Sequence, residues 1–78
     1  MTIYQVIYIN PENSMEPDIT NYELPSDAEY DFKDALRQLK GEFDSFDEVD
    51  NGQTILFHNN DDPDVTIAML KLVTAKVD

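Results

Sequence analysis

Residues 46–58 read FDEVDNGQTILFH, two short runs of β-forming residues on either side of Asn51-Gly52. Asn-Gly between two such runs predicts a β-hairpin with a two-residue turn, because both turn residues must adopt positive φ. A turn of this length places Phe46 opposite Phe57 and puts Ile55 on the same side. We therefore expect these three apolar side chains on one face of the hairpin, where they can contribute to a core.

A helix is predicted just before this hairpin, over residues 27–40. Ser26 and Glu29 have the spacing of a capping box, in which the two side chains bind free backbone N–H groups at the start of a helix. Gly41 is placed to end the helix. Apolar residues recur at the spacing of one helix face: Phe32, Ala35, Leu36, Leu39 and Phe43.

The N-terminal part predicts two strands separated by a loop. Residues 2–9 are rich in Ile, Val and Tyr and have apolar residues at both odd and even positions, which is typical of a central strand covered on at least one face. Residues 10–18 have the composition of a loop. Residues 19–24 predict a short, polar edge strand that ends at Pro25.

The last segment fits two structures. Asp62 as N-cap, Pro63 at the first helical position and the late Lys71 and Lys76 favour a helix over residues 64–76. Apolar residues also recur there at helical spacing: Val65, Ala68, Met69, Leu72 and Val73. The alternative is a strand, since Val65, Ile67 and Met69 alternate and β-branched residues are frequent. We predict the helix.

These elements together predict one α+β domain over residues 1–78. A chain of 78 residues has room for a single core only. The expected order is β(β)αββα, a small antiparallel sheet of three to four strands with two helices packed on one face. This arrangement is like a ferredoxin-type fold that lacks its last strand.

The charge of the chain is strongly negative. Seventeen acidic residues stand against five basic ones, which gives a formal net charge of −12 at pH 7. Such a chain repels nucleic-acid phosphates and anionic membranes and is attracted to basic surfaces. We therefore expect no direct binding to DNA, RNA or a membrane, and a basic protein surface as the partner. The simpler interpretation is that the charge keeps a small protein soluble.

The composition also predicts a cytoplasmic protein. Cysteine is absent, which excludes disulfides, thiolate metal sites and cysteine nucleophiles. Residues 1–6 lack the basic residues that open a secretion signal, and no apolar run approaches the roughly 18 residues of a membrane span.

The residues that usually carry catalysis or hold a metal are scarce. His58 is the only histidine, and two glycines, Gly41 and Gly52, cannot build a phosphate-binding loop. The stretch from Asp47 to Gly52 has the composition of a calcium loop, but Val49 and His58 stand where such a loop needs oxygen ligands. We predict no catalytic residue, no metal and no cofactor, and hence a protein that is not an enzyme.

Acidic residues gather on both sides of the hairpin and are our candidate partner-binding residues. If the fold brings the two runs together at one end of the sheet, their field is like that of the phosphate rows that basic nucleic-acid channels bind. The alternative interpretation is a solvated rim with no partner. The candidate residues are Glu42, Asp44, Asp47, Glu48, Asp50, Asp61, Asp62 and Asp64.

A small, cysteine-free, very acidic α+β chain with spaced carboxylates resembles the inhibitors that bacteriophages and mobile elements encode, the DNA-mimic and anti-CRISPR proteins. Residues 54–58, followed by Asp61-Asp62 and Met69-Leu70, look like the strand pair of the phage inhibitors of uracil-DNA glycosylase, although the Glu-Ser-aliphatic motif of those inhibitors is missing. The resemblance implies inhibition or modulation of a basic, nucleic-acid-handling protein.

Two other functions remain open at this point. One is a structural or assembly module that forms a homodimer by pairing its edge strand, residues 19–24. The other is an immunity protein that neutralises a basic toxin. For the inhibitor, aromatic anchors would supply most of the affinity. The candidate anchors are Tyr4, Tyr8, Tyr22 and Tyr30.

Overall fold

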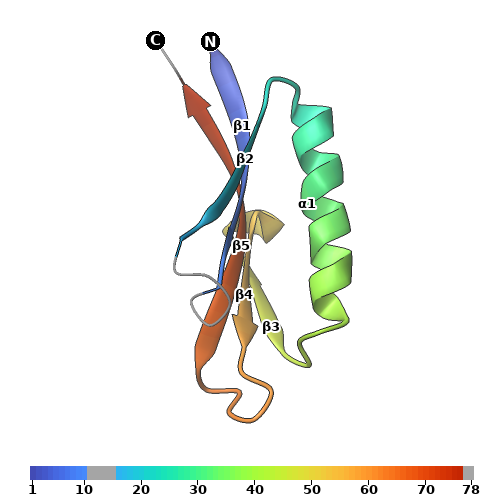
Figure 1. The fold of residues 1–78 in the computed structure, drawn as a ribbon, viewed down its shortest axis with the longest axis vertical. Helices are drawn as coiled ribbons and strands as arrows, with labels where there is room; N and C mark the ends of the chain where they lie inside the picture. The colour runs from blue at the N-terminus through green and yellow to red at the C-terminus, as the bar shows by residue number, and fades with distance from the viewer. Residues whose placement is uncertain (11–15, 77–78) are drawn as a thin grey trace.

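The structure, a computed structural model, describes residues 1–10 and 16–76 and consists of one sheet and one helix (Figure 1). Residues 11–15 of the predicted loop lie outside the described residues. The strands form a five-stranded antiparallel sheet in the order β2-β1-β5-β4-β3. In chain order the elements are β1 (Thr2–Ile9), β2 (Asp18–Tyr22), α1 (Pro25–Lys40), β3 (Phe46–Val49), the 3-10 turn η1 (Asp50–Gly52), β4 (Thr54–His58) and β5 (Thr66–Lys76).

The predicted second helix is wrong, because the last segment is strand β5. It forms eight antiparallel pairs with β1 on one side and also pairs with β4 on the other. Strand β5 has apolar residues on both faces, and such a strand also has apolar residues at the three- and four-residue spacing of a helix. The β-branched residues Thr66, Ile67, Val73 and Thr74 favour the extended backbone. Asp62 and Pro63 lie in a turn before β5 rather than at a helix start.

The predicted order β(β)αββα, with two helices on a sheet of three to four strands, is therefore wrong as well. The sheet has five strands and carries α1 alone. Strand β5 lies between β1 and β4 and so joins the N-terminal strand pair to the hairpin. The fold is not a ferredoxin-like arrangement without its last strand, because the last element is the central strand of the sheet.

The first half of the chain agrees with the predicted elements, with corrections at the second strand and at the helix start. Strand β1 has the predicted bounds, whereas the edge strand β2 begins at Asp18, one residue before the predicted start, and ends at Tyr22, two residues before the predicted end. The capping box is wrong: α1 begins at Pro25, and the N-cap Leu24 makes no side-chain cap. Proline suits the first helical position because its φ is already helical and its missing N–H has no partner there in any case. Gly41 follows the last helical residue, as predicted.

The hairpin is confirmed in register, since Phe46 pairs with Phe57. Asn51 has φ 57° and ψ 34°, Gly52 has φ 83°, and the Gln53 N–H donates to the Asp50 carbonyl at 3.1 Å. This is the geometry of a type I′ turn, the turn whose twist matches that of paired strands. Asp50 also has a positive φ of 52°, and strand pairing ends one residue earlier on each side than in a plain two-residue hairpin, so residues 50–53 connect the strands.

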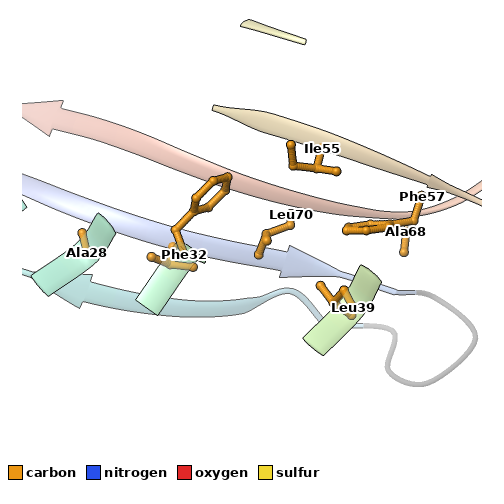
Figure 2. Packing of buried hydrophobic residues seen from close by; sticks show 8 residues of the cluster. Ala28, Phe32, Leu39, Ile55, Phe57, Ala68 and Leu70 are labelled. Carbon is orange, nitrogen blue, oxygen red and sulfur yellow. The ribbon is translucent and has the colours of Figure 1, made fainter. Parts of the chain in front are cut away.

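The core lies between α1 and one face of the sheet (Figure 2). Ile55, Phe57 and Leu70 are fully buried there, on neighbouring strands. The Phe57 ring lies 5.0 Å from the ring of Phe43 and 6.2 Å from that of Phe46. The buried apolar cluster is Val6, Ala28, Phe32, Leu39, Ile55, Phe57, Ala68 and Leu70.

Candidate functional site

Five of the eight candidate acids lie on two loops at the same end of the molecule, the loop after α1 and the loop between β4 and β5 (Figure 1). All five are exposed. We call this set the acidic end: Glu42, Asp44, Asp61, Asp62 and Asp64.

Asn60 links the two loops of the acidic end. Its side-chain Oδ1 accepts from the Asp44 N–H at 2.9 Å, and its Nδ2 donates to the Glu42 carbonyl at 3.0 Å. The His58 N–H also donates to the Ser45 carbonyl at 3.0 Å. The relative position of the two runs of acids is thus fixed by hydrogen bonds to the backbone, which leave the carboxylates of Glu42 and Asp44 facing solvent.

The loop between β4 and β5 is shaped by its own side chains. Asn59 Oδ1 accepts from the Asp61 N–H at 2.8 Å, and Asp62 Oδ1 accepts from the Asp64 N–H at 3.3 Å. Both are the Asx pattern, in which a side chain replaces a backbone partner in a turn. The side chains of Asn59 and Asp62 therefore stabilise the loop. Asp61 and Asp64 contribute only their backbone N–H groups to these bonds.

The other three candidate acids do not join the acidic end. Asp47 accepts a hydrogen bond from His58 Nε2 at 2.8 Å, because a carboxylate can only accept. Asp50 accepts from the Thr54 hydroxyl at 3.0 Å in the hairpin turn. Glu48 lies on the edge strand β3 opposite Ile55, on the face of the sheet that carries α1.

A groove adjoins the acidic end, between α1 and the strands β2, β1 and β5. It has a volume of about 250 Å³. Its floor is apolar, with Val6, Leu39 and Leu70 among the lining residues, and Glu42 belongs both to its wall and to the acidic end. Two further carboxylates, Asp18 and Asp31, also line it. An apolar floor with carboxylates along its walls fits a side chain that combines methylene groups with a positive charge.

Sequence reasoning did not find this groove or the role of Asn60. The groove unites residues from β1, β2, α1 and β5, and the contact of Asn60 with residues 42–44 spans 16 to 18 positions. No local pattern marks either feature. An Asn in a loop is ordinary turn chemistry, and only the folded chain shows what it bridges.

The four candidate aromatic anchors differ in exposure. Tyr4, Tyr8 and Tyr22 are half-buried and pack against the core, whereas Tyr30 is 77% exposed on the outer side of α1. Tyr8 also lines the groove. Tyr30 alone among the four has a free ring, but it lies away from the acidic end.

The ionisation of Tyr22 reports on the contact between β2 and α1. Its hydroxyl donates to Asp31 Oδ2 at 2.6 Å, and this hydrogen bond, with burial and the nearby charges of Asp31 and Asp27, raises the pKa of Tyr22 above its usual 10.0. We expect one of the four tyrosines to ionise last in an alkaline absorbance titration, and Asp31→Asn to remove that delay. The unfolded chain loses this proton first, so the contribution to stability is present below pH 10 and is lost above it. A wild-type curve that Asp31→Asn leaves unchanged would contradict the contact.

Neither a metal site nor a membrane-spanning helix is found in residues 1–10 and 16–76. No group of three or more His, Asp or Glu side chains there is arranged to hold a metal ion. The helix of this part of the chain is too short and too polar to cross a bilayer.

Comparison of the chain with protein-family models, with curated proteins and with solved structures gives no match.

Proposed function

We propose that this chain is a non-catalytic protein that binds a basic protein surface through its acidic end and the adjoining groove, and thereby inhibits or modulates the protein it binds. The observation that carries the proposal is the pair of Asn60 hydrogen bonds, which hold two separate runs of carboxylates side by side. The partner we expect is a nucleic-acid-handling protein, since such proteins expose basic channels. We place the interaction in the cytoplasm because the chain contains no cysteine.

A fixed loop backbone suits this task better than a mobile one. A charged partner is steered to the site at long range, and steering raises association rates by about 10- to 1,000-fold over uncharged encounter. Loops whose backbone is already held in place lose less conformational freedom on binding. The hydrogen bonds of Asn60, Asn59 and Asp62 keep the loops in shape before a partner arrives.

The groove supplies what the exposed carboxylates lack, a place for a desolvated anchor. Charges at a rim raise association rate and specificity, whereas affinity depends on a few well-packed side chains. A lysine or arginine of the partner can lay its methylene groups against the partly exposed apolar lining residues Tyr8 and Ala35 and bring its charge to Glu42 or Asp18. Glu42 thus connects long-range attraction with the anchor.

The test is a charge-neutral triple variant, Glu42→Gln, Asp44→Asn and Asp61→Asn. None of these three side chains makes a hydrogen bond within residues 1–10 and 16–76, and the backbone groups that bind Asn60 and Asn59 are kept. The tagged chain is incubated with nuclease-treated bacterial lysate at low salt, and captured proteins are identified and purified. We expect the variant to associate with the captured protein about tenfold more slowly at low ionic strength, and the difference to shrink in high salt.

The matched control neutralises three exposed acids at the other end of α1, namely Glu23→Gln, Asp27→Asn and Glu29→Gln. It has the same net charge as the test variant and changes a site about 20 Å away along the helix axis. The control should keep most of the wild-type association rate. If both triple variants slow association equally, net charge alone is responsible and the acidic end is not the binding site.

A further inference from the structure

The central strands have apolar side chains on both faces, but α1 covers only one of them (Figure 1). Side chains alternate between the two faces of a strand. The buried Val6 and Leu70 therefore face α1, and their strand neighbours point to the opposite side. Within residues 1–10 and 16–76, no helix or strand packs on that opposite side. We call it the open face, and its large aliphatic residues are Ile3, Ile7, Ile9, Ile19, Val49, Leu56, Ile67, Met69 and Val73.

These aliphatic residues are contiguous. Ile9 pairs with Met69, and Met69 pairs with Leu56 on its other side, so that the three form one row across β1, β5 and β4. Together with Ile67 they line a shallow hollow of about 240 Å³. An antiparallel sheet with one face in water normally has polar residues on that face. Here polar side chains such as Gln5, Asn21 and Thr54 stand beside the aliphatic row, but the centre of the open face is aliphatic.

The open face is also nearly free of charge. Among the strand residues that point to it, Asp47 and Lys71 are the two charged ones, of opposite sign, and Asp47 is hydrogen-bonded to His58. The whole chain has a net charge of −12, so the acids are concentrated elsewhere. A neutral aliphatic face does not match the basic surface proposed above for the acidic end. It matches another neutral aliphatic face.

The area of the open face can be compared with what a stable dimer needs. Strands of four to eleven residues, about 4.8 Å apart with about 3.3 Å per residue, make a sheet face of roughly 500 Å². Because side chains project from the sheet, the accessible area of the face is larger than this flat area. It is close to the roughly 600 Å² per copy at the lower limit of stable interfaces.

We infer that the open face binds the open face of a second copy of this chain. The result is a symmetric dimer with the two sheets packed about 10 Å apart and the helices outside. A two-fold axis brings identical neutral faces together and leaves both acidic ends exposed. The dimer uses the face of the sheet and not the edge strand β2. It leaves the partner-binding surface of the proposed function free.

The salt dependence of the dimer is opposite to that of the acidic end. Two chains of the same strong charge repel each other, and salt screens this repulsion while it leaves apolar packing intact. We expect dimerisation to strengthen as salt rises, whereas binding of a basic partner weakens. The failure of one proposal is thus distinguishable from the failure of the other.

The experiment is sedimentation equilibrium of the full chain at about 0.05 M and about 0.5 M NaCl, where the screening length falls from about 14 Å to about 4 Å. Three variants each make the net charge one unit more negative. Met69→Glu puts a carboxylate into the row of aliphatic residues and should weaken the dimer at least tenfold. Lys71→Met replaces the positive charge of the open face by an apolar side chain and should strengthen the dimer about fivefold. Tyr30→Glu, on the outer side of α1, should change the dissociation constant less than about twofold.

Circular dichroism checks that each variant is folded, and Lys71→Met decides the matter if Met69→Glu does not fold. A wild-type chain that stays monomeric up to millimolar concentration in high salt would overturn the proposal, and the open face would then belong to a different protein or lie free. Equal effects of Met69→Glu and Tyr30→Glu in folded variants would overturn it too.

Discussion

Phe57→Ala is expected to lower the free energy of unfolding by about 3–5 kcal/mol. The side chain of Phe57 is fully buried, and its ring lies against those of Phe43 and Phe46. Truncation removes the apolar contacts of three elements, because Phe43 precedes β3, Phe46 lies in it and Ala68, the neighbour across the sheet, lies in β5. A chain of 78 residues has a total stability of about 4–12 kcal/mol, so the loss is a large part of it.

The measurement is urea unfolding followed by circular dichroism, at a fixed protein concentration because a dimer would make stability depend on it. Tyr30→Ala is the matched control: it also truncates an aromatic ring, but one that is 77% exposed, and it should change stability by less than about 0.5 kcal/mol. A Phe57→Ala chain that unfolds within about 1 kcal/mol of wild type would show that the cluster in Figure 2 is not the centre of the core.

The features that could be predicted from the sequence are those determined by residues close together in the chain. The register of Phe46 with Phe57 follows from Asn51-Gly52, since a two-residue turn admits a single pairing. The helix over residues 27–40 was found for the same reason, although its first residue is Pro25. In both cases the residues that decide the structure lie within a few positions of one another.

The last segment could not be assigned in this way, because its structure depends on partners far along the chain. Thr2 pairs with Lys76, and the strand pairing between β1 and β5 continues inward to Ile9 and Met69. Apolar residues needed on both faces of β5 have the same spacing as one face of a helix, so the periodicity was ambiguous. The alternation of Val65, Ile67 and Met69 was the correct signal. The N-cap pattern of Asp62 and Pro63 favoured a helix locally. The pairing of β5 with both β1 and β4 stabilises the strand instead.

The candidate site also has a part that could be predicted from the sequence and a part that depends on the folded chain. That acids gather on both sides of the hairpin was visible in the sequence, but which of them share a surface was not. Asp47 and Asp50 are adjacent in sequence to the others and yet are bound to His58 and Thr54. Glu42 and Asp61 are 19 positions apart and are brought together through Asn60 and its neighbours.

The acidic residues and the open face complement each other in one chain. A protein with an uncovered aliphatic sheet face risks non-specific aggregation, and a high net charge opposes it by repulsion between molecules. This gives a second physical use for the charge of −12 beside the proposed recognition of a basic partner. The two uses involve different residues, because neutralising the acidic end leaves the open face unchanged.

Gly52→Val is the second large effect we expect, a loss of about 2 kcal/mol of stability. Gly52 has φ +83°, a region in which a β-branched residue is strained, and a Cβ added there meets no atom within 4 Å. The loss therefore comes from backbone conformation alone and not from a clash. Because Asn51-Gly52 fixes the pairing of Phe46 with Phe57, the same strain also favours a shifted register that would take both rings out of the core.

Gln53→Val provides the comparison, since it introduces the same side chain at the next position, where φ is −85°. It should cost less than about 0.5 kcal/mol, because that backbone is open to any residue and the carbonyl of Gln53 still accepts from the Leu72 N–H. Urea unfolding of the two variants distinguishes the effect of backbone strain in the turn from the effect of the valine side chain itself. Equal stability of Gly52→Val and Gln53→Val would mean that the hairpin does not depend on a type I′ turn, and the register of β3 and β4 would then have to come from the packing of Phe46, Ile55 and Phe57 alone.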